Sequence, residues 1–307
     1  MSLRQPTERQ AVFELIFAGA LWGFGFVATQ WALTTWNPAG VLLCRFTGAL
    51  VIGEIIYLIS QIRQKEKTPW KDDFKGSIPA GLLLGTFLLM QTIGLQYTTA
   101  TKSGFITTLY VVFVPVANAL FFKKKLPLFG FILIACALAG TFLLMDARFE
   151  TLVSDINIGD LWTLAAAIGA TAHIIYIGRF THRIQNAFRV NNFQTLWSLA
   201  IIVPAIFLMP KIQTGPVNPQ SLAGLFILAA ACSVLGFYIQ VRTQKVLSDT
   251  TASMLFLLES PYAFFFAYVL MGDRLNGWQA CGALLILGAA LGMVLLESAQ
   301  TNKKQSR

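Results

Sequence analysis

The segment VFELIFAGALWGFGFVATQWAL, residues 12–33, decides the fold class, because it is an apolar run of 22 residues. A helix of that length rises about 33 Å, enough to cross the ~30 Å hydrocarbon core of a bilayer. The run is longer than the apolar core of a signal peptide, and no small-residue cleavage site follows a short apolar region. We therefore expect it to stay in the mature protein as a membrane-spanning helix.

Runs of similar length fill the rest of the chain. Of the 307 residues, 56% are hydrophobic and 12% are charged, and the mean hydropathy is +0.65. A soluble domain of this size could not bury so much apolar surface, so lipid must cover the surplus. We predict an all-α membrane protein with ten transmembrane helices, at residues 12–33, 39–61, 77–96, 103–122, 127–145, 160–181, 190–209, 221–243, 251–271 and 275–297.

The net charge of +9 comes from short basic clusters between these runs, a pattern typical of membrane topology that argues against a nucleic-acid partner. If the N-terminus is cytoplasmic, the inner basic residues are Arg4, Arg9, Arg63, Lys65, Lys67, Lys71, Lys75, Lys123, Lys124, Lys125, Arg179, Arg183, Arg189, Arg242, Lys245, Lys303, Lys304 and Arg307. The outer segments hold only Lys102, Arg148, Lys211 and Arg274. Because Lys and Arg are retained inside, we predict a multi-pass protein of the cell membrane with both termini cytoplasmic.

The chain reads as an internal repeat, with residues 1–146 and 160–297 as its two halves and 298–307 as a cytoplasmic tail. Aligning Pro115 with Pro261 brings the glycines of 130–140 close to those of 282–292. Because each half has an odd number of spans, the second half must be inverted relative to the first. Inverted repeats place a binding site at their interface and permit alternating access. A chance match between Gly- and Pro-rich helices is the alternative.

Several short motifs carry a resemblance to a known family. They are ALWGFGF at residues 20–26, CRF at 44–46, GLQYTTA at 94–100, the stretch 105–115, and LESP at 258–261. With these motifs the chain resembles the ten-helix branch of the drug/metabolite transporter superfamily, which has two EamA-type domains. Ser260 departs from the tightest Leu-Glu-Pro form of the last motif. The resemblance implies a metabolite carrier, often an exporter of amino acids or related compounds, without a bound cofactor.

Charged or titratable groups inside the spans are candidates for a functional role, because a charged side chain at a helix centre costs at least ~2.5 kcal/mol. Glu259 and His173 both lie eight residues, or about 12 Å, from the inner ends of their spans. We expect them to face a central cavity, where Glu259 could bind a substrate ammonium group or cycle a proton. Alternatively, they only tie helices together through hydrogen bonds.

Further candidates flank these two residues. Trp162 and Tyr176 share a helical stripe with His173, and Tyr262 shares one with Glu259, although such stripes are more often packing surfaces. Trp22 lies near the middle of the first span, and the nearby Gly23 and Gly25 would let a ligand or another helix approach it. The remaining polar candidates are Gln91, Tyr110, Tyr238 and Gln240.

Arg45 could extend its long side chain to the outer interface, or it could neutralise a substrate carboxylate. Glu54, nine positions further on, should reach the inner interface or pair with a neighbour. Pro115 and Pro261 are hinge candidates, with a static kink as the alternative.

A membrane enzyme, a receptor or scaffold, and a channel are the competing classes. An enzyme would need a metal set, a phosphate-binding loop or paired carboxylates, and the sequence has none of these motifs. The four cysteines lie singly in apolar runs, so we predict no metal site. The expected partners are a small-molecule substrate and protons, within the lipid bilayer. The oligomeric state, monomer or homodimer, stays open.

Overall fold

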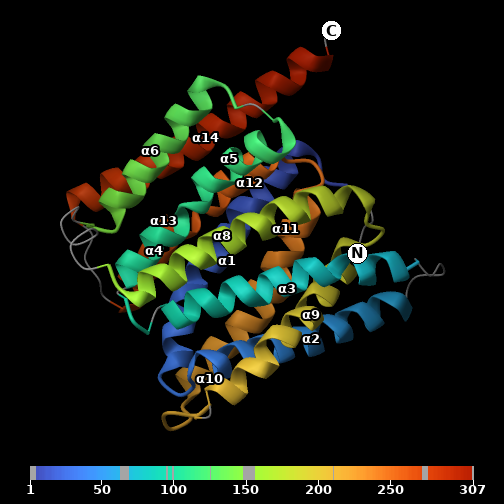
Figure 1. The fold of residues 1–307 in the computed structure, drawn as a ribbon, viewed down its shortest axis with the longest axis vertical. Helices are drawn as coiled ribbons and strands as arrows, with labels where there is room; N and C mark the ends of the chain where they lie inside the picture. Colours follow the sequence, from blue (N-terminus) through green and yellow to red (C-terminus); the bar gives the residue numbers. More distant parts are fainter. Residues whose placement is uncertain are drawn as a thin grey trace.

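The computed structural model describes residues 5–62, 69–94, 96–98, 100–124, 126–147, 156–209, 211–271 and 276–305. These residues form a helical bundle without strands, apart from an isolated bridge between Trp36 and Gln213 (Figure 1). Several basic residues used for the topology prediction lie outside the described residues; they are Arg4, Arg63, Lys65, Lys67, Lys125, Arg148, Arg274 and Arg307.

The helices follow the ten predicted spans within a few residues. Those of the first half are α1 (Glu8–Leu33), α2 (Pro38–Ile62), α3 (Lys71–Gly94), α4 (Ala100–Thr108), α5 (Tyr110–Phe122) and α6 (Leu128–Leu144). Those of the second half are α8 (Ile158–Phe180), η1 (Thr181–Arg183), α9 (Ala187–Leu208), α10 (Pro219–Phe226), η2 (Ile227–Gly236), α11 (Phe237–Thr243), α12 (Asp249–Phe256), α13 (Glu259–Met271) and α14 (Gly277–Gln305).

The described helices have the length and composition of membrane spans. Counted with consecutive helices joined, 9 of them are long and apolar enough to cross a bilayer, and α6 is a shorter apolar helix of 17 residues. Together they account for the ten predicted spans, and the all-α membrane fold is confirmed.

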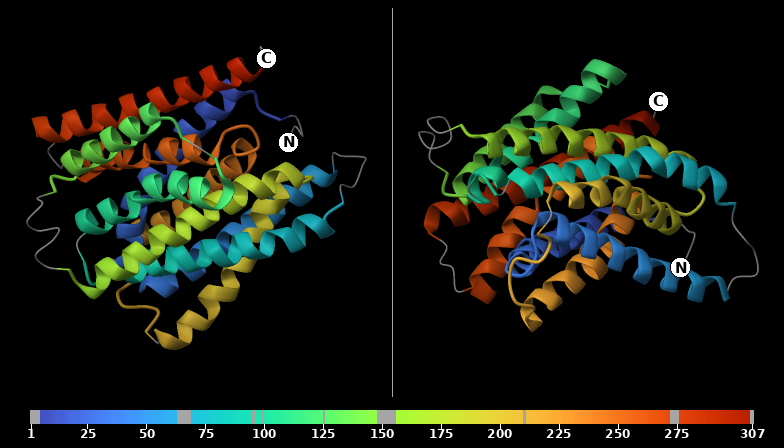
Figure 2. Two further views of the ribbon diagram at one scale, coloured as in Figure 1. Left: turned by 45° about the horizontal axis from the view of Figure 1, so that its top comes forward. Right: turned by 60° about the horizontal axis from the view of Figure 1, so that its bottom comes forward.

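In the main contacts between the halves, each helix of the first half packs on the helices that correspond to those on which its counterpart in the second half packs. α3 packs on α8 and α9, just as the eighth span, α10 to α11, packs on α1 and α2. α4 and α5 pack on α8, as α12 and α13 pack on α1. α2 pairs with α9 and α6 with α14, and Figures 1 and 2 show α6 (green) lying along α14 (red). This exchange is what repeats related by a two-fold axis require, whereas the inversion of one half stays a prediction from the odd number of spans.

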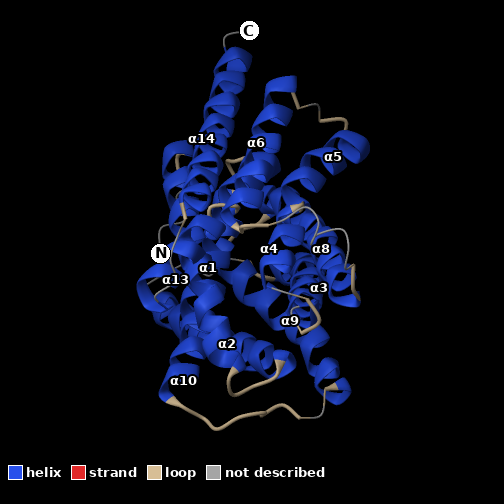
Figure 3. Cartoon of the chain, turned by 90° about the vertical axis from the view of Figure 1, so that its left-hand side faces the viewer, coloured by secondary structure: helices blue, strands red, loops and turns tan. Residues whose placement is uncertain are grey.

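Three spans depart from a continuous α-helix. The fourth is interrupted at Leu109 and the ninth at Leu257 and Leu258, so the breaks precede the predicted hinges at Pro115 and Pro261. In the ninth span the displacement has a clear cause, because a proline ring clashes with the carbonyl four residues earlier, here that of Leu257. The eighth span changes from α10 into the π-helical segment η2 and back into α11. Figure 3 shows α4 and α5 as separate helices.

The start of α1 and the last turns of α14 lie at one end of the bundle, which we name the terminal end. Ser298 Oγ of α14 donates to Glu8 Oε1 of α1 over 2.7 Å. α1 begins in a capping box in which Thr7 and Gln10 satisfy each other's backbone N–H groups. An even number of spans therefore separates the two ends, as the topology prediction requires.

Candidate functional site

A cavity of about 140 Å³ lies in the middle of the bundle, where the interrupted helices meet. Residues from both halves line it, including the ends of α4, α5, α12 and α13 that flank the breaks. Of the predicted residues, the structure brings seven together in its wall: Trp22, Arg45, Gln91, Tyr110, His173, Gln240 and Glu259. Others in the wall, such as Thr107, Phe237 and Phe256, were not predicted.

Four other candidates lie outside this wall. Trp162 is in the first turn of α8, about 16 Å along the helix from His173, and is 36% exposed on the outside of the bundle. Tyr176 donates its hydroxyl to Gly76 O over 2.7 Å. Tyr238 packs its ring on Phe188, with centroids 5.4 Å apart.

Tyr262 lies beside Gly23 of α1, at a contact too close for any larger residue at position 23. The stripe that joined Tyr262 to Glu259 assumed an unbroken helix. The break before α13 places Phe256 beside Glu259 in the cavity wall instead.

Arg45 does not extend to the interface, because its side chain is 8% exposed and lines the cavity. Its Nε donates to Ser233 Oγ over 2.8 Å, and its Cζ lies 5.8 Å and 5.9 Å from the ring centroids of Phe46 and Phe237. Arg45 forms no ion pair with any described residue, and its two terminal nitrogens make no hydrogen bond there. A buried guanidinium without a counter-charge is costly, so this group is suited to binding an anion.

Glu259 is the first residue of α13, at a helix N-terminus inside the bundle. The dipole of that terminus favours a negative charge. Within the described part of the chain, the Glu259 carboxylate makes neither an ion pair nor a hydrogen bond. The cavity thus holds one cation and one acid, and neither forms an ion pair with a described residue.

Aromatic and hydroxyl groups complete the wall. The Trp22 ring lies 5.5 Å from the Phe237 centroid and 5.3 Å from that of Phe256, and its Nε1 donates to Cys232 O over 3.2 Å. The Tyr110 hydroxyl is buried and has no hydrogen-bond partner among the described residues. An apolar wall with a few convergent polar groups is typical of small-molecule sites.

His173 belongs to a buried polar chain that the sequence analysis missed. Its Nε2 lies 3.2 Å from Gln194 Oε1, and Gln194 Nε2 donates to Asn191 Oδ1 over 2.9 Å. Asn191 Nδ2 then donates to the carbonyls of Ser233 and Val234 in η2. The signal was present in the sequence, since NNFQ at residues 191–194 is a polar cluster inside the seventh apolar run.

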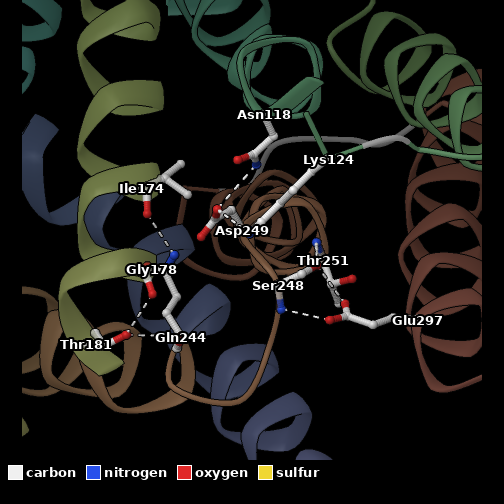
Figure 4. A network of polar contacts seen from close by, with 10 residues as sticks. All are labelled: Asn118, Lys124, Ile174, Gly178, Thr181, Gln244, Ser248, Asp249, Thr251 and Glu297. Atoms are coloured by element: carbon white, nitrogen blue, oxygen red, sulfur yellow. Dashed lines mark hydrogen bonds and ion pairs between the residues drawn. The ribbon is translucent and has the colours of Figure 1, made fainter. Parts of the chain in front are cut away.

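A second polar network lies toward the terminal end of the bundle, and Figure 4 shows its contacts around Gln244 and Asp249. Gln240, in the cavity wall, donates to Gln244 Oε1 over 3.0 Å, and Gln244 donates to Ile174 O over 2.9 Å. Asp249 accepts from Asn118 Nδ2 over 3.3 Å and lies 3.8 Å from Lys124 Nζ. These contacts join α5, α8, α11 and α12 across the bundle, between the cavity and the terminal end.

Glu54 took the second of its two predicted arrangements. It pairs with Arg189 of α9 and accepts from Asn192 over 3.2 Å, away from the cavity. Among the described residues, no group of three or more His, Cys, Asp or Glu side chains could hold a metal ion.

Comparisons with known proteins agree with this architecture. The model of the EamA-like transporter family matches the chain twice, over residues 10–146 and 157–295. A protein of Archaeoglobus fulgidus described as an uncharacterized transporter is 28% identical over 281 residues, which cover 90% of this chain and 83% of that protein.

A solved structure, described only as the crystal structure of a protein, superposes with a TM-score of 0.74 at 19% identity. The match covers 94% of this chain and 98% of that one, and it supports the fold alone. Because the family model covers both halves of the sequence, the chain belongs to the EamA-like transporter family.

Proposed function

We propose that this membrane transporter exports amino acids or closely related amphipathic zwitterions from the cytoplasm by alternating access, and that it is not an enzyme. One observation carries the proposal: the central cavity contains Arg45 and Glu259, each without a counter-charge from the described residues. A zwitterion supplies both missing charges in one molecule. Its carboxylate would bind the terminal nitrogens of Arg45 and its ammonium group would bind Glu259.

The rest of the wall fits such a solute. The rings of Trp22, Phe237 and Phe256 offer an apolar surface for a hydrocarbon or aromatic side chain. The cavity volume of about 140 Å³ suits a small metabolite rather than a peptide or a lipid. The N-terminus of α13 is also the kind of half-helix end that transporters present to solutes near the middle of the membrane.

Glu259 can couple export to protons. A carboxyl group that binds the solute ammonium in one state and a proton in another exchanges the two across the membrane. The network around Asp249 and Gln244 would then be the cytoplasmic gate, which opens when solute enters from inside the cell. Protons and solute would therefore move in opposite directions.

The test is flux through purified protein in proteoliposomes, with a panel of radiolabelled L-amino acids and with their matching amines, which lack the carboxyl group. We expect saturable counterflow of at least one amino acid, faster with an opposing pH gradient, and little flux of its amine. If no member of the panel moves above the rate of protein-free vesicles, the assignment fails. If flux is unaffected by a pH gradient, the proposed proton coupling is wrong, while the assignment of the solute still holds.

A further inference from the structure

The π-helical segment η2 accepts one hydrogen bond from Arg45. Ser233 of η2 accepts from Arg45 Nε over 2.8 Å, and this is the guanidinium's hydrogen bond to the described part of the chain. Because Nε is the inner nitrogen of the group, the bond fixes the plane of the guanidinium and leaves Nη1 and Nη2 toward the cavity. The position of one buried hydroxyl therefore decides where those two donors point.

The backbone that carries this hydroxyl is held from the side by Asn191. Asn191 Nδ2 donates to Ser233 O over 3.1 Å and to Val234 O over 3.0 Å. The i to i+5 pattern of a π-helix is less favourable than that of an α-helix, and such segments persist where other contacts support them. Trp22 Nε1 supports the preceding carbonyl, Cys232 O.

The orientation of Asn191 is fixed in turn. Because its Nδ2 serves two carbonyls, its Oδ1 must accept, and it does so from Gln194 Nε2 over 2.9 Å. Gln194 therefore presents Oε1 to Nε2 of His173, in the cavity wall, at 3.2 Å. Asn191, Gln194 and Ser233 are at most 1% exposed, so water does not compete for these bonds.

We propose that Ser233 and Asn191 are positioning residues for the carboxylate of the solute, acting through Arg45. This inference rests on the proposed function, because it assigns the Arg45 terminal nitrogens to that carboxylate. Ser233 orients the guanidinium, and Asn191 holds the turn of η2 that carries Ser233. Neither side chain touches the solute.

The test compares one amino acid with its matching amine. With the amino acid of highest flux in the panel above, Ser233→Ala and Asn191→Ala should each raise KM roughly fivefold to tenfold and change kcat little. The residual flux of the amine should stay unchanged, because it has no carboxylate for Arg45 to bind. Ser233→Thr should restore the KM, since it retains the hydroxyl.

Ser198→Ala is the matched control, because Ser198 is equally buried and bonds only to Gly81 O and Gln194 O. It should leave both KM values unchanged. In the double variant Ser233→Ala/Asn191→Ala, the KM should rise no further than in the more severe single variant, because both act through the same guanidinium.

The outcomes distinguish the positioning role from the proposed function. The positioning role is overturned if the variants lose transport of amino acid and amine equally. It is also overturned if both single variants keep the parent KM while Arg45→Gln raises it; in either case the proposed function stays intact. If Arg45→Gln also leaves the preference for the carboxylate unchanged, the solute assignment is wrong. If no panel member is transported, the function on which the inference rests is absent.

Discussion

Glu259 is the residue whose replacement separates binding from coupling. Glu259→Gln keeps the size of the side chain and a hydrogen-bonding oxygen but removes the negative charge and the proton. We expect flux of the transported amino acid to fall at least tenfold and its dependence on a pH gradient to disappear. Radiolabel uptake into proteoliposomes at several internal pH values measures both.

Glu54→Gln is the control for this prediction, because Glu54 pairs with Arg189 outside the cavity. It should retain the pH dependence. His173→Ala, measured alongside, tests whether the imidazole takes part. Normal flux with normal pH dependence in both Glu259→Gln and His173→Ala would show that neither residue couples transport.

Tyr110 allows stability and binding to be separated. Its buried hydroxyl has no hydrogen-bond partner in the described part of the chain, so Tyr110→Phe removes a desolvated polar group without breaking a hydrogen bond there. We expect the thermal unfolding midpoint in detergent to stay the same or rise, corresponding to a gain of up to about 1 kcal/mol. If the hydroxyl contacts the solute, the KM rises severalfold in the same variant; a lower midpoint would indicate a hidden partner.

At this scale the sequence predicted the charged residues of the cavity better than its aromatic ones. Arg45, His173 and Glu259 could be found from the sequence because a charged or titratable group inside a membrane span is energetically costly. Trp162 shares a helical stripe with His173 but lies at a different depth. Tyr262 was placed on one stripe with Glu259 and Leu255, but the ninth span is broken between Leu255 and Glu259. Both Trp162 and Tyr262 therefore lie outside the cavity wall. Asn191 and Ser233 carry no charge, so the free-energy cost of placing a charge in lipid could not identify them.

Among the elements, α6 and α14 are held together by glycines. A Cβ on Gly282 would lie 2.5 Å from Gly140 O, which leaves no space for a side chain where the helices cross. We expect Gly282→Val to separate the two helices and to destabilise the protein by about 1–3 kcal/mol. Thermal unfolding in detergent measures this against Gly288→Val, a glycine of the same helix with nothing within 4 Å of its Cβ position.

The network that we propose as the gate joins three elements, α5, α8 and α12. Asp249→Asn removes the charge that holds Lys124 and weakens the bond from Asn118. We expect the cavity to become accessible from the terminal end. A cysteine replacing Gln240, in a background without the four native cysteines, should react several times faster with a membrane-impermeant maleimide added on that side.

Asp160→Asn is the comparison for the gate. Asp160 accepts from Thr98 Oγ1 over 2.6 Å, at the start of α8 and thus far from the gate. This variant should leave the labelling rate from the terminal end unchanged. Equal rates in Asp249→Asn and the parent protein would mean that Asp249 does not close the cavity.

The sequence predicted the membrane-spanning segments but not the breaks and the π-helical segment within them. Hydropathy measures how long a helix stays in lipid, and it is unchanged by a break at Leu109 or by ten residues of π-helix in the eighth span. Such a shift in hydrogen-bond register needs contacts from other helices, such as those of Trp22 and Asn191, that no local pattern contains.

For the whole molecule, the ends of the chain give the most direct test. Ser298 and Glu8 share a hydrogen bond, so both ends must face the same compartment. Single cysteines placed at Ser2 and Ser306 should both resist an impermeant thiol reagent in intact cells and react after permeabilisation. Labelling of one of them in intact cells would contradict the ten-span topology.

The repeat predicted two related halves, but it predicted neither which helices pair across them nor the solute. Two five-span units with matching prolines predict a two-fold arrangement in outline. Which solute fits depends on side chains that meet only in the folded protein, such as Arg45 of α2 and Ser233 of η2.

The π-helix has a consequence for direction. Its counterpart in the first half, α3, is one unbroken α-helix, so the two repeats are not interchangeable in detail. Were they identical, turning the protein over would change nothing, and a solute would meet the same surroundings from either compartment. Differences of this kind make the two faces of the protein chemically unequal, so the loading and unloading of a solute need not have the same affinity.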